Sequence, residues 1–251
     1  MVRRASLVVI TAFMLLAAPS AALAQKASKP ARFTIGVSAG VQQAAEDVSD
    51  RFSFPKNVET ETVDVKYPMK PWALIDLAAG YRVWKNLGIG AAVSVTSGKG
   101  SAEVTATVPH PFFFNQPRTV TGTDNDIAHS ETGVHLTLQY LIPATGRLHV
   151  TLEGGPSWVT VDREVVTDVT ITESYPYDTA AFGGAVTKSA HGSALGFNGG
   201  FDITWMFVES VGLGGIVRYT RADIDLNAVN GRSLAIKAGG VQGGVGLRVL
   251  F

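Results

Sequence analysis

The stretch IDLAAGYRVWKNLGIGAAVSVT, residues 75–96, alternates apolar residues with small or polar ones on both sides of a short break. Successive side chains of a β-strand point to opposite faces, so each half predicts a strand with one apolar face. The break at Trp84-Lys85-Asn86 leaves room only for a tight turn. The stretch therefore predicts an antiparallel hairpin.

The same alternation recurs along the chain and predicts an all-β fold of eight antiparallel strands. In the last strand the pattern slips by one residue near Gly239-Gly240, which predicts a β-bulge. The predicted strands are residues 33–41, 75–83, 87–96, 133–140, 148–155, 195–205, 211–220 and 241–251.

The connections between these strands alternate strictly between long and short. Residues 42–70, 97–127 and 162–190 are polar and are predicted to be long loops, and 226–232 is a shorter member of that set. The tight turns fall at residues 84–86, 143–146 and 208–210. Long loops at one end and short turns at the other are typical of an up-and-down outer-membrane barrel.

The charged residues within the strands share the face of the small residues, while the opposite face is aliphatic and aromatic. Lipid outside and a narrow polar lumen inside fit this pattern, and a sheet in lipid has to close into a barrel. Eight strands leave an interior that side chains can fill. We therefore predict ion pairs that plug the lumen; the alternative is a narrow pore for small ions or solutes. The predicted lumen network is Asp76, Arg82, Glu153, Asp202, Arg218 and Arg248.

The N-terminus has the features of a secretory signal. Arg3 and Arg4 precede an apolar run over residues 7–18, and Ala22-Leu23-Ala24 supplies a cleavage site. The run is shorter than the ~20 residues of a helical membrane span. We predict a signal peptide at 1–24, a short N-terminal segment at 25–31, and a barrel domain at 32–251 that reaches the outer membrane.

Composition excludes several functions. The chain has no cysteine, and without Arg3 and Arg4 it carries 19 basic against 21 acidic residues, which gives no electrostatic case for binding nucleic acid. Residues 119–126 lack the spacing and the final Glu of a calcium loop. We expect no cofactor and no metal site. Acidic residues concentrate in the predicted loops, where they solvate the surface or contact a host ligand, another cell or, through divalent cations, lipopolysaccharide.

The last strand resembles the C-terminal targeting signal of outer-membrane proteins, in which apolar residues alternate and an aromatic residue ends the chain. The residues that carry this likeness are Val245, Leu247, Val249 and Phe251. Residues 32–251 as a whole resemble the small eight-stranded barrels of the OmpA/OmpX type. The resemblance implies periplasmic chaperones and the barrel-assembly machinery during biogenesis, then a monomer in outer-membrane lipid and lipopolysaccharide. It also implies a non-enzymatic role in envelope structure or in adhesion through surface loops.

Two segments stay open. His191-Gly192-Ser193 weakly resembles the His-x-Ser of lipid A 3-O-deacylase barrels, which implies a Ser nucleophile and a His oriented by a carboxylate. About a dozen residues further on, where that family has the carboxylate, this chain has Ile203. We therefore predict no catalytic residue. Phe112-Phe113-Phe114 could dip into the outer leaflet, pack over the barrel mouth or engage a partner.

Overall fold

A computed structural model describes residues 32–44, 46–142, 146–227 and 233–251. The predicted signal peptide, residues 25–31, most of the turn at 143–146 and most of the connection at 226–232 lie outside the described residues. In the part described, no helix is long and apolar enough to cross a membrane. The strands are β1 (Phe33–Ala44), β2 (Val48–Lys56), β3 (Glu59–Tyr67), β4 (Trp72–Trp84), β5 (Leu87–Val108), β6 (Arg118–Ile142), β7 (Leu148–Glu173), β8 (Ala180–Met206), β9 (Val211–Asn227) and β10 (Ser233–Leu250).

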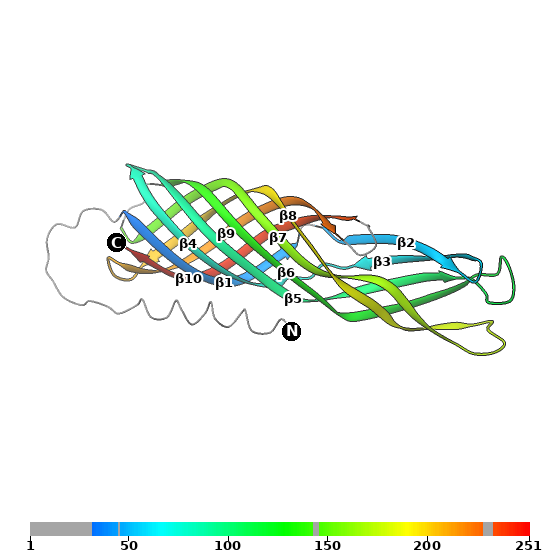
Figure 1. Cartoon of the computed structure of the whole chain (residues 1–251). Coiled ribbons are helices and arrows are strands. Elements are labelled where there is room, and N and C mark those ends of the chain that lie inside the picture. The colour runs from blue at the N-terminus through cyan, green and yellow to red at the C-terminus, as the bar shows by residue number, and fades with distance from the viewer. Residues whose placement is uncertain (1–31, 45, 143–145, 228–232) are drawn as a thin grey trace. The chain divides into compact units, whose positions relative to one another are not determined.

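Eight of these strands close a ring. The sheet order is β2-β3-β5-β4-β1-β10-β9-β8-β7-β6, and an additional β5–β6 pairing closes β5, β4, β1, β10, β9, β8, β7 and β6 on themselves. Adjacent strands are antiparallel throughout (Figure 1). The prediction of an all-β antiparallel barrel is confirmed, and the ring passes through eight strands as predicted; β2 and β3 are two further strands that the sequence analysis did not predict.

The three segments predicted to be long loops are largely strands, so that prediction was wrong. Residues 48–67 form the β2–β3 hairpin, whose second strand pairs with the far half of β5. Residues 97–127 extend β5 and β6, and residues 162–190 extend β7 and β8. We call β2, β3 and these extended parts the extension; in Figure 1 its hairpins run on beyond the ring.

The polarity of the two faces reverses where the ring passes into the extension. On β5 the outward residues change from Val93 and Val95 to Lys99, whereas the inward residues change from Ser94, which is buried, to Val104, also buried. Inward and outward residues of β5 still alternate beyond this point, but the apolar residues now lie on the inward face. A search for strands with an apolar outward face therefore does not detect the extension. This is why the extension looked like polar loop.

The barrel therefore has two different interiors. Inside the extension, buried aliphatic side chains form one apolar cluster that includes Val63, Val65, Val104, Val165 and Val169. Inside the rest of the ring the buried side chains are mostly polar. There the outward rows are apolar and solvent-exposed, and we call them the apolar band: 33–41, 75–83, 87–95, 134–142, 150–158, 195–205, 211–219 and 241–249.

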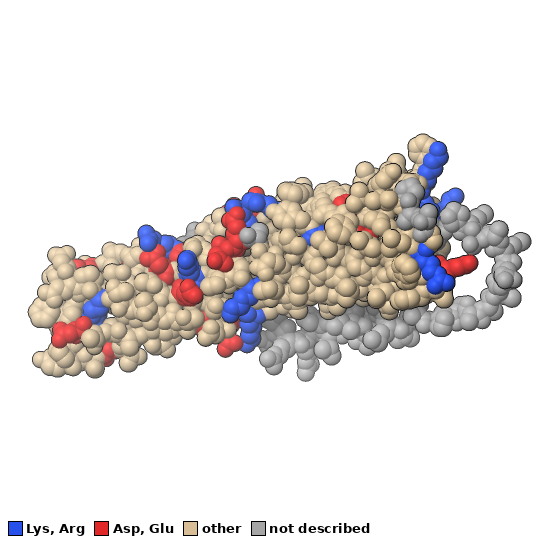
Figure 2. Space-filling model, turned by 180° about the vertical axis from the view of Figure 1, so that it is seen from behind, with Lys and Arg blue, Asp and Glu red and all other residues tan. Residues whose placement is uncertain are grey.

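Charged residues lie on both sides of the apolar band. Figure 2 shows a mostly tan zone between charges at the turn end and charges at the start of the extension. Within the last strand, Gly239 and Gly240 have φ angles of 89° and 133°, conformations that favour glycine. Their pairing with Arg221 and Thr220 continues without a register shift, so the slip in the pattern is not a bulge of the ladder.

Candidate functional site

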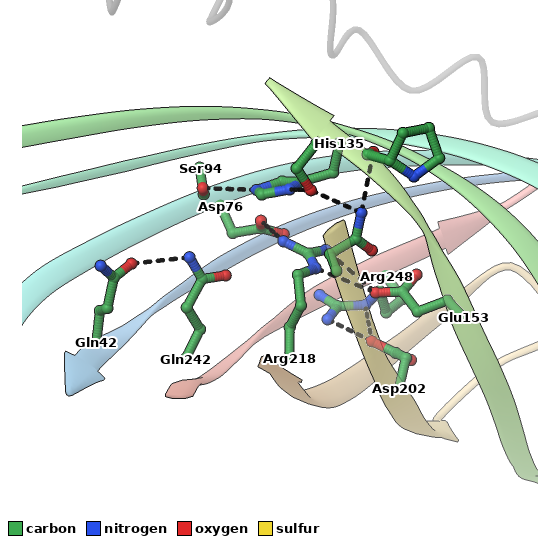
Figure 3. A network of polar contacts seen from close by, with 12 residues as sticks. Gln42, Asp76, Ser94, His135, Glu153, Asp202, Arg218, Gln242 and Arg248 are labelled. Carbon is green, nitrogen blue, oxygen red and sulfur yellow. Dashed lines mark hydrogen bonds and ion pairs between the residues drawn. The ribbon is translucent and has the colours of Figure 1, made fainter. Parts of the chain in front are cut away.

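Arg218 occupies the centre of the polar interior. Its Nη1 donates to Asp76 Oδ2 at 2.6 Å, and its Nη2 and Nε donate to Glu153 Oε1 at 3.2 and 3.3 Å. The guanidinium thus joins strands β4 and β7 from β9 (Figure 3). Arg218 and Asp76 are each only 1% exposed. A charge buried this deeply needs a close opposite charge, and each member of this trio has one.

A second ion pair lies nearer the turn end. Arg248 donates through Nη2 and Nε to Asp202 Oδ2 at 2.6 and 2.9 Å, so it links β10 to β8. Glycines make room for it: a Cβ at Gly36 would lie 2.8 Å from the Arg248 side chain, and one at Gly214 2.9 Å from it. The small residues of the inward face are therefore the space that the long charged side chains occupy.

The side chains of His135, Ser94, Ser157 and Asn198 extend the polar network on the side of Arg218 that faces the extension. His135 is fully buried and contacts Ser94 Oγ through Nε2 and Ser157 Oγ through Nδ1, both at 2.8 Å. Asn198 donates to the same Ser157 Oγ at 2.8 Å. Both ring nitrogens of His135 are thus satisfied, which fixes this side chain between β5 and β7.

A third cluster surrounds Glu131 at the border with the apolar interior. Its carboxylate accepts from Gln42 Nε2 at 2.7 Å and from the Gly239 N–H at 3.1 Å, and His129 Nε2 lies 3.0 Å away. Gln242 donates to Gln42 Oε1 at 2.8 Å. Between this cluster and His135 lies a cavity of ≈ 10 Å³, about the room of one water. Side chains of these clusters therefore occupy the polar interior between the strands.

The structure brings five of the six residues of the predicted lumen network into these ion pairs. Arg82 stands apart: it is half-buried at the turn end, beside Lys85 and His149, and makes no ion pair with a described carboxylate. Sequence analysis missed Glu131, His129 and Gln42. Each has the parity of the inward row of its strand, one to four residues beyond the predicted strand end, so extending the rows would have found them.

The residues of the predicted C-terminal targeting signal lie on the last strand of the ring. Val245 and Leu247 point outward in the apolar band and are 66% and 57% exposed. Val249 pairs with Ile35 of β1, and the Phe251 ring lies 6.4 Å from that of Phe33. This segment therefore closes the ring against the first strand.

The far end of the extension carries a cluster of exposed aromatic side chains, which we call the aromatic tip. It consists of residues 109–117, between β5 and β6, and residues 174–179, between β7 and β8. Phe112, Phe113 and Phe114 are 65%, 53% and 66% exposed. The Phe112 ring lies edge-on to Tyr177 at 5.5 Å, and the Phe113 ring lies 4.9 Å from His110. The aromatic rings of the tip thus contact one another although most of their surface faces solvent.

Hydrogen bonds hold the turns of the tip together. Arg118 donates to the carbonyl oxygens of Tyr177 and Pro109 at 2.8 and 3.0 Å, and its Nη1 pairs with Glu173 at 2.6 Å. Asn57, in the β2–β3 turn, also donates to the Pro109 carbonyl at 3.2 Å. Three hairpins therefore share one buried arginine and one carbonyl at their ends.

No protein-family model and no curated protein sequence matches the chain. Among solved structures it is similar to neisserial surface protein A, with 13% identity and a TM-score of 0.40 over 87% of this chain and 97% of that one. It is also similar to the outer membrane protease OmpT of Escherichia coli, with 11% identity and a TM-score of 0.48 over 90% and 99%. For the N-terminal β-barrel domain of Pseudomonas aeruginosa OprF the values are 9% and 0.37 over 89% and 100%. The chain thus resembles small outer-membrane β-barrels in structure.

Proposed function

We propose that the chain is an outer-membrane protein whose side-chain-filled barrel carries a rigid aromatic tip outside the cell, where the tip contacts a partner. One observation carries the membrane assignment: the ring is closed, and its outward rows are apolar over the length a membrane strand needs. The row from Ile75 to Val83 spans nine residues, within the ~9–11 of a tilted transmembrane strand. A soluble monomer rarely exposes an apolar surface of this extent.

Export by the signal peptide, insertion by the barrel-assembly machinery and residence as a monomer among outer-membrane lipid and lipopolysaccharide belong to the same proposal. The apolar C-terminal row with its final Phe251 supports the assembly step. The charges at both ends of the apolar band support the depth of insertion, because headgroups and water meet the protein there.

The aromatic tip stands too far from the apolar band to reach the membrane of its own cell. From Val95 to Val108 the strand runs roughly 40 Å along its own axis at about 3.3 Å per residue, which is a height of about 30 Å at a tilt of about 45°. The apolar cluster inside the extension and the hydrogen bonds of Arg118 hold the extension in this elongated form. This distance argues against insertion into the outer leaflet, and the exposure of the three rings argues against packing over the barrel mouth, so we favour contact with a partner for Phe112-Phe113-Phe114. Aromatic side chains, Phe among them, are enriched at the cores of protein interfaces.

The first experiment tests the tip. Cells that display the protein are compared with cells that display the Phe112→Ser, Phe113→Ser, Phe114→Ser variant for attachment to epithelial cell layers and to non-expressing cells of the same strain. We expect the variant to attach about tenfold less, as for the loss of a central hot spot. A variant with Thr105→Ser and Thr121→Ser, on the side of the extension, is the matched control. Equal attachment at equal surface expression would refute an adhesive role for the tip.

The second experiment tests the filled interior. The purified protein is reconstituted into planar bilayers and its conductance is recorded. We expect no reproducible ohmic channel, because buried ion pairs and the apolar cluster lie in series along the axis. A regular single-channel conductance would overturn the filled-barrel proposal in favour of the narrow pore.

A further inference from the structure

Apolar side chains project from all three hairpin ends at the far end of the extension (Figure 1). Beside the three phenylalanines, Tyr175 is 83% exposed, and Val58, in the β2–β3 turn that is hydrogen-bonded to the Pro109 carbonyl, is 91% exposed. Val58 has a φ angle of 66°, a left-handed conformation that favours glycine or asparagine over a β-branched residue. Turn formation therefore does not account for an apolar side chain at this position, which enlarges the exposed apolar surface of the aromatic tip.

The aromatic tip carries little charge. Residues 109–117 and 174–179 contain no lysine or arginine, and Asp178 is their only acidic residue. Arg118, which follows the first of these segments, is buried, and its guanidinium is held by the two carbonyl oxygens and the glutamate described above. The residues of the tip therefore offer no exposed cation to an anionic partner, so charge does not determine what the tip binds.

Several backbone groups of the aromatic tip are already satisfied inside the protein. The N–H groups of Phe112 and Phe113 both donate to Nδ1 of the buried His110, each at 3.1 Å. Two further N–H groups also have partners: that of Asn115 donates to Glu59 Oε1 at 3.0 Å, and that of Tyr177 to the Ser174 carbonyl at 2.8 Å. Four positions of the tip are proline and have no N–H: 109, 111, 117 and 176. These positions bring no unpaired donor into apolar surroundings, where such a group is costly.

An exposed surface that is apolar, weakly charged and internally hydrogen-bonded fits a lipid phase. A protein partner is bound partly through hydrogen bonds across the interface, whereas a bilayer takes up apolar side chains without them. We propose that the aromatic tip inserts its rings into a phospholipid bilayer that faces the cell surface. Phe112, Phe113 and Phe114 enter the acyl region, and the hydroxyl of Tyr175 stays at headgroup level, as is usual for tyrosine. The inference rests on the proposed function, because the tip faces such a bilayer only when the apolar band lies in the outer membrane.

The test uses the protein in lipid nanodiscs, which cover the apolar band and leave the aromatic tip free. The nanodiscs are mixed with phosphatidylcholine vesicles and floated through a density gradient. We expect the protein to float with the vesicles equally at low and high salt, and equally when part of the lipid is anionic phosphatidylglycerol, because uncharged rings carry the binding. The Phe112→Ser, Phe113→Ser, Phe114→Ser variant is expected to bind about 10²-fold more weakly, because three rings lose their transfer into apolar surroundings.

The matched control is Phe112→Leu, Phe113→Leu, Phe114→Leu, which keeps an apolar surface of similar transfer free energy but removes the rings. We expect it to bind vesicles within about threefold of the wild type. Because the chain has no cysteine, Val58→Cys can carry a single polarity-sensitive dye. Its emission is expected to shift to the blue when vesicles are added, whereas the same dye at Thr105→Cys, on the side of the extension, should not change.

Four results would overturn the proposal: no vesicle binding by the wild type, equal binding by the serine variant, loss of binding in the leucine variant, or release of the protein at high salt. Unchanged heat-dependent mobility on gels verifies that each variant is folded. The proposed function fails separately. Attachment to cells without binding to vesicles leaves the adhesive role in place and refutes the lipid partner, whereas binding to vesicles without attachment to cells refutes the adhesive role alone.

Discussion

Replacing Arg218 with methionine gives the sharpest test of the interior. The change removes the only cation that contacts Asp76 and Glu153 among the described residues and leaves two carboxylates buried. At an effective dielectric constant near 20, each contact of about 3 Å has a gross energy of about 5 kcal/mol, which desolvation offsets in part. Breaking a buried pair by removing one partner costs about 3–5 kcal/mol. We expect a loss of that size in the free energy of unfolding.

The assay is urea unfolding in lipid vesicles, followed by the fluorescence of the four tryptophans. A triple variant, Asp76→Asn, Glu153→Gln and Arg218→Met, removes all three charges, and we expect it to recover more than half of the loss because no unpaired charge remains. Arg221→Met on the same strand removes a partly exposed pair with Asp223 at 3.6 Å and is expected to leave the midpoint unchanged. A loss below about 1 kcal/mol for Arg218→Met, or a triple variant as unstable as the single one, would refute the reasoning.

Three further predictions concern the outer surface. Leu138→Arg, at the middle of the apolar band, is expected to lower the free energy of unfolding in vesicles by about 2–4 kcal/mol, whereas Thr105→Arg on the extension should change it little; equal effects would contradict the membrane placement. Arg118→Met is expected to speed proteolysis of the aromatic tip by about tenfold while the ring stays resistant, as mass spectrometry of the fragments would show. The Lys99 ammonium, hydrogen-bonded to Asp126, lowers the pKa of that carboxyl, so its contribution to stability is present above the ordinary aspartate pKa and is lost as pH falls through the lowered value; NMR titration should find the midpoint rising in Lys99→Gln.

The part of the barrel with the apolar band could be predicted because its apolar residues all lie on the outward face of their strands. Ile75 and Leu77 point outward and Asp76 points inward. This alternation indicates both that the segment is a strand and which of its faces is outward. Much of the extension also alternates: Val63 and Val65 are buried and Asp64 lies between them, although the β7–β8 ladder shifts register between Val166 and Asp168. The apolar face of the extension points inward and its polar face points outward. Because the strands were identified by an apolar outward face, these segments were interpreted as solvated loops. A two-sided search for period-two alternation would have found both.

Contacts between strands are harder to derive. The inward parity of Asp76, Glu153 and Arg218 follows from the sequence, but their meeting depends on how far β4, β7 and β9 are staggered around the ring. Likewise Asp162 stands 29 residues from His191, and only the β7–β8 register makes them neighbours. Arg82 shows the converse, because a correct inward parity does not bring a residue at the strand end within reach of a carboxylate.

The reversal of polarity along the long strands also determines the depth at which the protein would sit in the membrane. In the proposed placement, the apolar band contacts lipid and the extension contacts water, and the change between them falls within the long strands, as between Val95 and Lys99 of β5. Sinking by one outward step, about 7 Å along a strand, would carry Lys99 and Asp162 towards hydrocarbon; rising by one step would lift Val95 and Leu195 into water. Either shift costs free energy on several strands at once. The bilayer therefore fixes the height of the aromatic tip above the cell surface.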